Sequence, residues 1–216
     1  MKEILKLTLS LTLICAIAGA ALAYVSTKTQ SAREEAATRQ RNEKMELLLP
    51  SETGAVREAG KAVSEDGTEV VFFAADDASG KTIAYCAESS DPSGFGGEIK
   101  VLVGLDPDGS ICGVLVSENS ETPGIGSNVV SRSETKSFWS IFPGKTGAGK
   151  GGMLPNKYLD SYTGQPISVS GGFSFGETPS DGVVVPVSGA TVSSRAVLNA
   201  VNRVGQAWKN FNEEAK

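Results

Sequence analysis

Residues 97–117, Gly-Glu-Ile-Lys-Val-Leu-Val-Gly-Leu-Asp-Pro-Asp-Gly-Ser-Ile-Cys-Gly-Val-Leu-Val-Ser, decide the fold of the chain. Two apolar runs, 97–105 and 111–117, are separated by Asp106-Pro107-Asp108-Gly109, residues that favour a tight turn. Apolar runs of this length on either side of such a turn predict a β-hairpin.

Further strands are expected on both sides of this hairpin. Runs 70–74 and 82–86 are rich in β-branched and aromatic residues and are separated by a turn at 76–80. Short strands are also expected over 167–169 and 183–187, and a short helix over 133–142. The predicted fold class is α+β, with a twisted antiparallel sheet packed by helices.

The C-terminal segment predicts an amphipathic helix that starts at an unusual turn. Apolar residues recur in steps of three and four on one helix face, at Val197, Val201, Val204, Trp208 and Phe211. The helix follows Ser188-Gly189-Ala190-Thr191, which offers a hydroxyl, a permissive glycine and the free N–H groups of a helix start. These features suit a covalently held phosphate, and the alternative is an ordinary helix cap.

A second segment, Glu121-Thr122-Pro123-Gly124-Ile125-Gly126, follows the second hairpin strand. Pro123 restricts Thr122 to extended geometry. Gly124 and Gly126 allow the backbone to lie against a planar ring.

These two motifs, SGATVSSRAV and ETPGIG, resemble those of FMN-binding subunits of ion-translocating electron-transport complexes. The resemblance is to the G subunit of the Rnf complex and to the related C subunit of the Na⁺-translocating NADH:quinone reductase. It implies that a flavin transferase joins FMN through its phosphate to Thr191. Val185 stands where the family usually carries an acidic residue that the transferase recognises, and Asp181 is a nearby substitute.

The resemblance also implies which residues surround the flavin. The expected cofactor-binding residues are Ser188, Gly189, Ala190, Thr191, Ser193, Ser194, Glu121, Thr122, Gly124, Ile125 and Gly126. No catalytic acid, base or nucleophile is expected, because the cofactor carries the chemistry.

The function implied is electron relay within a ferredoxin:NAD⁺ oxidoreductase complex of Rnf type, with the other membrane subunits as partners. Two alternatives stay open. One is another flavinylated electron carrier, such as the quinone-reductase subunit. The other is a non-redox, membrane-anchored binding module whose SGAT is only a helix cap.

Composition excludes several functions. The net charge of −5 and the absence of a basic patch argue against nucleic-acid binding. The chain has no histidine, which excludes a Ser-His-Asp triad and His-ligated zinc or haem, and no metal site is expected. Cys86 and Cys112 are either buried thiols or a disulfide pair.

The N-terminal residues contain an uncharged apolar run, 7–25, which as a helix spans about 28 Å. A retained membrane anchor is favoured. A signal peptide cleaved near Ala21-Leu22-Ala23 is the alternative, and a lipid attachment at Cys15 is disfavoured by the bulky Ile14. The expected organisation is an anchor over 1–25, a helical neck over 26–50 and an FMN-binding domain over 51–216.

Charge counting does not fix the orientation of this anchor, because cations follow the apolar run as well as precede it. From the resemblance, we expect a single-pass protein of the cytoplasmic membrane with its C-terminal domain on the extracytoplasmic side.

The segment 144–151, Gly-Lys-Thr-Gly-Ala-Gly-Lys-Gly, nearly spells a P-loop. It ends in Gly151 where the motif requires Ser or Thr, and no strand and helix flank it as a P-loop needs. Nucleotide hydrolysis is therefore not predicted.

Overall fold

A computed structural model describes residues 2–124, 126–132 and 155–214. The chain divides into two units, residues 1–40 and 41–216. The first belongs to helix α1 (Lys2–Leu48), which also supplies the first residues of the second unit. The expected helix at and beyond the apolar run is therefore present, and it ends at Leu48.

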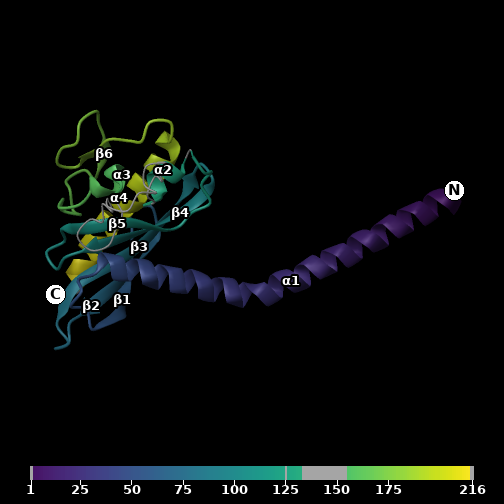
Figure 1. Cartoon of the computed structure of the whole chain (residues 1–216), viewed down its shortest axis with the longest axis horizontal. Helices are drawn as coiled ribbons and strands as arrows, with labels where there is room; N and C mark the ends of the chain where they lie inside the picture. Colours follow the sequence, from purple (N-terminus) through teal and green to yellow (C-terminus); the bar gives the residue numbers. More distant parts are fainter. Residues whose placement is uncertain (1, 125, 133–154, 215–216) are drawn as a thin grey trace, which may run out of the picture. The chain divides into compact units, whose positions relative to one another are not determined.

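The second unit is built on a five-stranded antiparallel meander in the order β1-β2-β3-β4-β5. Figure 1 labels these strands. Their bounds are β1 Ala55–Val63, β2 Glu69–Asp76, β3 Thr82–Gly94, β4 Gly97–Leu105 and β5 Ile111–Glu118. The predicted α+β class and the antiparallel sheet are confirmed.

The predicted hairpin is β4 and β5. Its turn is closed by Asp106, whose Oδ1 accepts from the backbone N–H groups of Asp108 at 3.0 Å and Ser110 at 2.8 Å. Gly109 has a φ of +86°, which a residue with a side chain rarely adopts. The Asp and Gly residues that predicted this turn are therefore the ones that form it.

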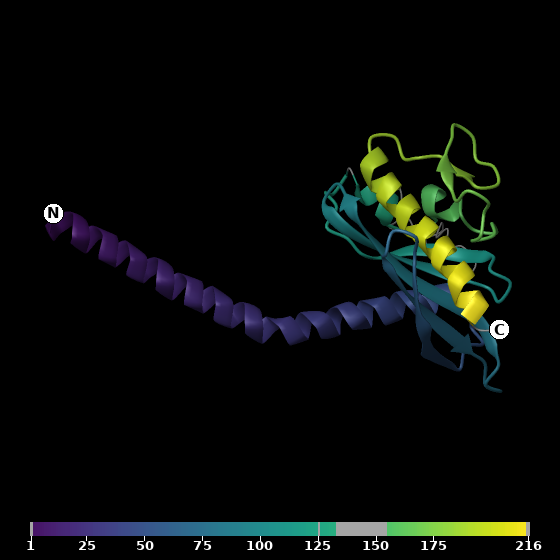
Figure 2. The ribbon, with the colours of Figure 1, turned by 180° about the vertical axis from the view of Figure 1, so that it is seen from behind.

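Helix α4 (Thr191–Glu214) lies across one face of the sheet, as Figure 2 shows in yellow. Val197, Val201, Val204 and Trp208 are buried and Phe211 is half-buried, so the predicted apolar face is the face that packs. Gly205 allows close packing, because a Cβ there would lie 2.5 Å from the carbonyl oxygen of Ile167.

The end of α1 within the second unit covers the opposite face of the sheet. Met45 and Leu48 pack with Phe73, Cys86 and Leu102 in a second, smaller core. Strands β2 to β5 are therefore covered on both faces, which explains their nearly continuous apolar runs.

Two of the predicted short strands are wrong in whole or in part. Residues 167 and 168 form a turn and 169 is irregular, since Pro166 has no N–H to donate to a strand ladder. The N–H of Ile167 donates to the carbonyl of Gly109 at 2.8 Å. The strand expected over 183–187 is only β7 (Val183–Val184), parallel to β6 (Ser174–Phe175), because Pro186 cannot extend the ladder. The helix expected over 133–142 and the segment 144–151 lie outside the described residues.

The possible disulfide between Cys86 and Cys112 is not formed, and both thiols are free. Cys86 lies on β3 and Cys112 on β5, with β4 between them. Two strand spacings amount to about 10 Å, beyond the reach of a disulfide.

Candidate functional site

The SGAT residues form a tight turn that leads into α4. Gly189 has a φ of +79°, and Ala190 donates its N–H to the carbonyl of Val187 at 3.0 Å. Ser188, Gly189 and Thr191 are exposed, whereas Ala190 is buried. Thr191 therefore presents its hydroxyl to solvent at the first turn of a helix, where backbone N–H groups lack intrahelical acceptors.

Ser194 closes this turn from inside. Its Oγ accepts from the N–H of Val187 at 3.1 Å, and its carbonyl accepts from the Tyr158 hydroxyl at 2.6 Å. Burial raises the pKa of Tyr158, which keeps that hydroxyl protonated as a donor. Ser194 was predicted to bind the cofactor, and the structure places it as a fully buried support of the SGAT turn.

The ETPG loop leaves β5 and turns into the short helix α2 (Ser127–Val130). Thr122 and Gly124 are exposed. Gly124 has a φ of +85° and donates its N–H to Ser127 Oγ at 2.8 Å. Ile125 lies outside the described residues, so its predicted contact with the flavin stays a prediction.

Glu121 points inward from this loop. One carboxylate oxygen, Oε1, accepts from the N–H of Gly96 at 3.3 Å. The other, Oε2, is buried and has no hydrogen-bond partner among the described residues. This side chain was predicted to border the flavin ring, and the structure shows it 8% exposed.

Gly126 joins the two motifs. A Cβ at this position would lie 1.7 Å from Glu121 Oε2 and 2.9 Å from Ser193 Oγ. Ser193 is 1% exposed, and its Oγ likewise has no partner in the described part of the chain. The structure thus brings ETPGIG and the SGATVSSRAV segment together at a glycine that has no space for a side chain.

A pocket of about 540 Å³ lies beside both motifs. We call it the inter-motif pocket. Its walls come from α2 and the residue after it, from helix α3 (Lys157–Asp160) with its flanks, and from the segments before the SGAT turn. The lining residues are Ser127, Asn128, Ser131, Pro155, Asn156, Lys157, Tyr158, Ser161, Glu177, Pro179, Val185, Pro186 and Val187.

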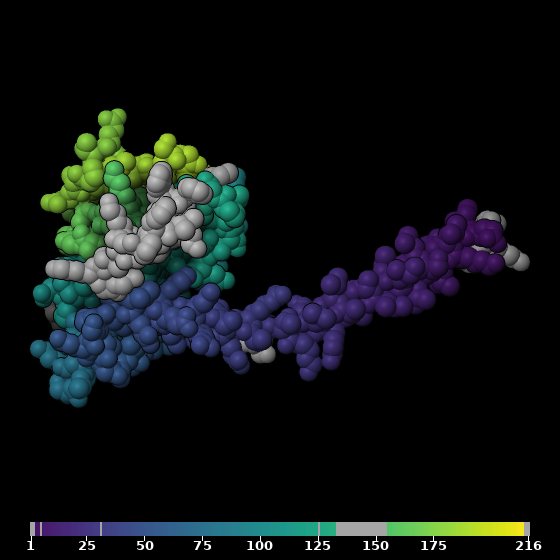
Figure 3. All heavy atoms as spheres, viewed as in Figure 1, coloured from purple at the N-terminus to yellow at the C-terminus, as the bar shows by residue number. Residues whose placement is uncertain are grey.

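In Figure 3 the green segment after α3 and the teal segment that contains α2 share one face of the domain. A volume of this size is typical of small-molecule sites. The pocket therefore has room for a planar ring.

Asn156 fixes the shape of the pocket wall. Its side-chain amide donates to the carbonyls of Val129 at 3.1 Å and Ser131 at 3.0 Å. Its Oδ1 accepts from the N–H groups of Tyr158 and Leu159 and caps α3. One buried side chain thus ties α2 to α3.

Arg195 adds a positive charge near the same end of α4. It stands four residues after Thr191 and so lies on the same helix face. Its guanidinium is 5.5 Å from the centre of the Phe175 ring. The exposed hydroxyl, the helix start and this cation together suit a phosphate.

Comparison with known proteins agrees with these features. The FMN-binding domain family matches residues 94–206, which include both motifs. The chain belongs to this family. FMN is therefore its cofactor.

Several relatives of this FMN-binding protein match it over nearly their whole length. The G subunit of the ion-translocating oxidoreductase complex of Methanosarcina acetivorans is 30% identical over 93% of this chain and 92% of its own. The corresponding G subunit of Salmonella typhi is 31% identical over 95% of this chain and 91% of its own. A crystal structure of NqrC from Shewanella oneidensis matches 77% of this chain and 70% of its own at 22% identity, with a TM-score of 0.47.

Sequence reasoning did not find most of the pocket residues. Asn156, Lys157 and Glu177 lie in segments without a regular apolar pattern, so no local signal marks them. The Arg195 side chain could have been noticed, since the spacing from Thr191 is visible in the sequence. Among the described residues, no group of three or more His, Cys, Asp or Glu side chains is placed to hold a metal ion.

Proposed function

We propose that Thr191 carries FMN as a phosphoester and that the isoalloxazine ring occupies the inter-motif pocket. The observation that carries this proposal is the approach of Ser193 to Gly126, which brings the two motifs together two residues after the exposed Thr191. FMN supplies electron transfer when it is bound. The residues of this chain hold its phosphate, orient its ring and shield one face from water.

Specific residues divide these tasks. The N–H groups at the start of α4 and Arg195 hold the phosphate. The exposed part of the ETPG loop, at Thr122 and Gly124, borders the ring. Glu121 and Ser193 pack around Gly126 on the buried side of the loop. Ser188 to Ala190 set the turn that presents Thr191, and Ser194 keeps it closed.

The test is in-gel fluorescence of the full-length protein co-expressed with a flavin transferase. We expect a fluorescent band under ultraviolet light that survives denaturation. Thr191→Ala should abolish it, and Thr163→Ala, which removes an exposed hydroxyl from a turn elsewhere, should keep it. A band that persists in Thr191→Ala would place the attachment elsewhere.

In the complex, the protein relays electrons between other subunits of an ion-translocating ferredoxin:NAD⁺ oxidoreductase. The names of its relatives support this role over that of a quinone-reductase subunit. The FMN-binding family argues against a non-redox binding module.

Residues 1–25 anchor the protein in the cytoplasmic membrane, 26–50 form a neck and 51–216 form the flavin domain. Among the described residues, one helix is long and apolar enough to cross a membrane. The domain lies on the extracytoplasmic side, where the transferase acts. Alkaline phosphatase fused to the C-terminus should be active, and an inactive fusion with an active cytoplasmic reporter would reverse the orientation.

A further inference from the structure

Two opposite charges line the inter-motif pocket without neutralising each other. Lys157 stands on one wall at the start of α3, and Glu177 stands on another wall, in the segment between β6 and β7. Both are exposed, and in the described part of the chain neither forms an ion pair. The remaining lining residues are neutral.

The deeper polar groups of these walls are already committed to the protein. The Asn156 amide bonds backbone groups of α2 and α3, and the Tyr158 hydroxyl bonds Ser194 and Tyr162. Ser161 Oγ donates to the carbonyl of Tyr158 at 2.6 Å. Lys157 and Glu177 are therefore the charged groups that can still reach a ligand in the pocket.

A ligand that satisfies both needs an acceptor and a donor along one edge. The pyrimidine edge of an isoalloxazine offers two carbonyl oxygens with the N3–H between them. We propose that Lys157 donates to a carbonyl of this edge and that Glu177 accepts from N3–H. This inference rests on the proposed function, because it requires the ring of the Thr191-bound FMN to enter the pocket.

The two side chains should then tune the flavin in opposite directions. Reduction places negative charge on the pyrimidine edge, and fixed charges nearby shift the reduction potential. Lys157 stabilises the reduced ring and Glu177 destabilises it. If the substitutions only damaged the structure, there would be no reason for the reduction potential to shift in opposite directions in the two variants.

The test measures the midpoint potential of the flavin by redox titration of full-length, flavinylated protein. Lys157→Gln should make the potential more negative, and Glu177→Gln should make it more positive. Lys209→Gln is the control, because Lys209 is also exposed and lies about 27 Å along α4 from Thr191. This control should leave the potential unchanged.

Two failures are distinguishable. If the variants carry covalent flavin but keep the wild-type potential, or shift it in the same direction, Lys157 and Glu177 do not bind the ring edge and the attachment at Thr191 still stands. If wild-type protein takes up no covalent flavin beside an active transferase, the proposed function itself fails.

Discussion

Glu121 and Ser193 each bring a buried oxygen to Gly126, and neither oxygen finds a hydrogen-bond partner among the described residues. The two residues belong to different motifs and to different elements. Their meeting point leaves no space for a side chain. This packing explains why the loop needs a glycine two residues after Gly124, where no positive φ requires one.

Gly126→Ala should destabilise the domain by about 1–3 kcal/mol, because the added methyl group collides with the Glu121 carboxylate. Urea unfolding followed by circular dichroism measures this change. In a double-mutant cycle with Glu121→Ala, the carboxylate is absent and part of the loss should be recovered. Strictly additive losses would show that the two positions do not touch.

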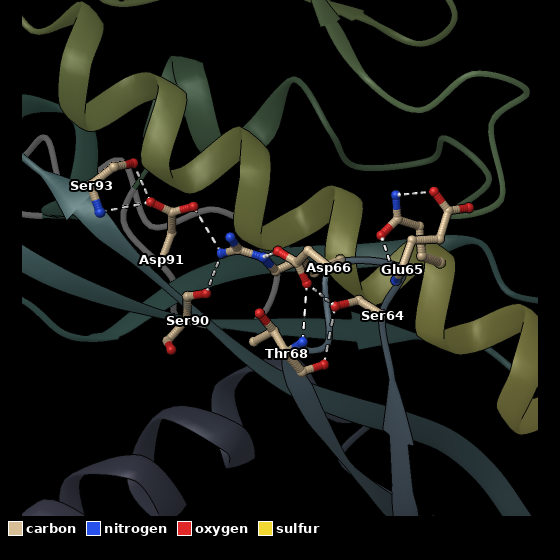
Figure 4. A network of polar contacts seen from close by, with 9 residues as sticks. Ser64, Glu65, Asp66, Thr68, Ser90, Asp91 and Ser93 are labelled. Carbon is tan, nitrogen blue, oxygen red and sulfur yellow. Dashed lines mark hydrogen bonds and ion pairs between the residues drawn. The ribbon is translucent and has the colours of Figure 1, made fainter.

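Arg203 holds α4 to the sheet through a partly buried network. Figure 4 labels its partners Asp66, Ser90 and Asp91. The guanidinium pairs with Asp91 at 2.8 Å and Asp66 at 2.6 Å, and it donates to the Ser90 carbonyl at 2.6 Å. The Asp91 side chain is 2% exposed. Loss of the cation therefore leaves a buried carboxylate uncompensated.

Arg203→Met should cost about 3–5 kcal/mol of unfolding free energy, as expected when one partner of a buried ion pair is removed. Arg57→Met is the matched control. Arg57 also pairs with an aspartate, Asp76, but its side chain is 58% exposed, so this loss should stay within about 1 kcal/mol. Equal losses in the two variants would contradict the account of the network.

The same network predicts a pH dependence. Hydrogen bonds, first from Ser64 and then from Arg203, hold the pKa of Asp66 well below its usual value. Because the folded-state pKa is depressed, this stabilisation is complete above the unfolded-state pKa of about 4 and is lost as the pH falls below it. Asp66→Asn should therefore flatten the fall in stability between about pH 4 and pH 2. If the fall in stability over this pH range were the same in Asp66→Asn as in the wild type, Asp66 would not contribute to it.

The parts of the fold that were predictable have strong local signals. Hairpin β4–β5 combines long apolar strands with an Asp-Pro-Asp-Gly turn, and α4 has a regular apolar face. Strand β1 was not predicted, because Ala-Val-Arg-Glu-Ala-Gly-Lys-Ala-Val consists mainly of charged and small residues and its backbone bulges between Glu58 and Gly60. The strand is stabilised by its backbone pairing with β2 and not by the β propensity of its residues.

In the candidate site, too, only the features with a local sequence pattern were predictable. The motifs indicated the turn at Thr191 and the ETPG loop, but not the direction in which Glu121 points. That direction depends on the β3–β4 turn, where Gly96 supplies the N–H for Glu121 Oε1. The pocket, which requires three distant segments to meet, is a tertiary feature without a local pattern.

The two domain cysteines should differ in reactivity. Burial raises the pKa of the Cys86 thiol, and partial desolvation raises that of the Cys112 thiol. Of the two residues, Cys112 is exposed to solvent and Cys86 is buried. Iodoacetamide at about pH 8 should label Cys112 in native protein and Cys86 only in denaturant. Peptide mapping by mass spectrometry reads this out, and a disulfide-linked pair of peptides would overturn the assignment.

Arg195 should assist attachment of the phosphate to Thr191. Arg195→Gln should lower the flavinylated fraction at a fixed, short reaction time with the transferase. Arg195→Lys should retain more, because it keeps the charge but loses the forked geometry. The fluorescence of the protein band measures this fraction, and equal fractions in both variants and wild type would remove Arg195 from the site.

The most direct test of the account is mass spectrometry of the peptide that contains Thr191, taken from full-length protein matured with its transferase. We predict that this peptide carries the mass of FMN less one water and that fragmentation places the addition on Thr191. An unmodified Thr191 peptide, in protein whose FMN is covalently attached at another residue, would contradict the central claim.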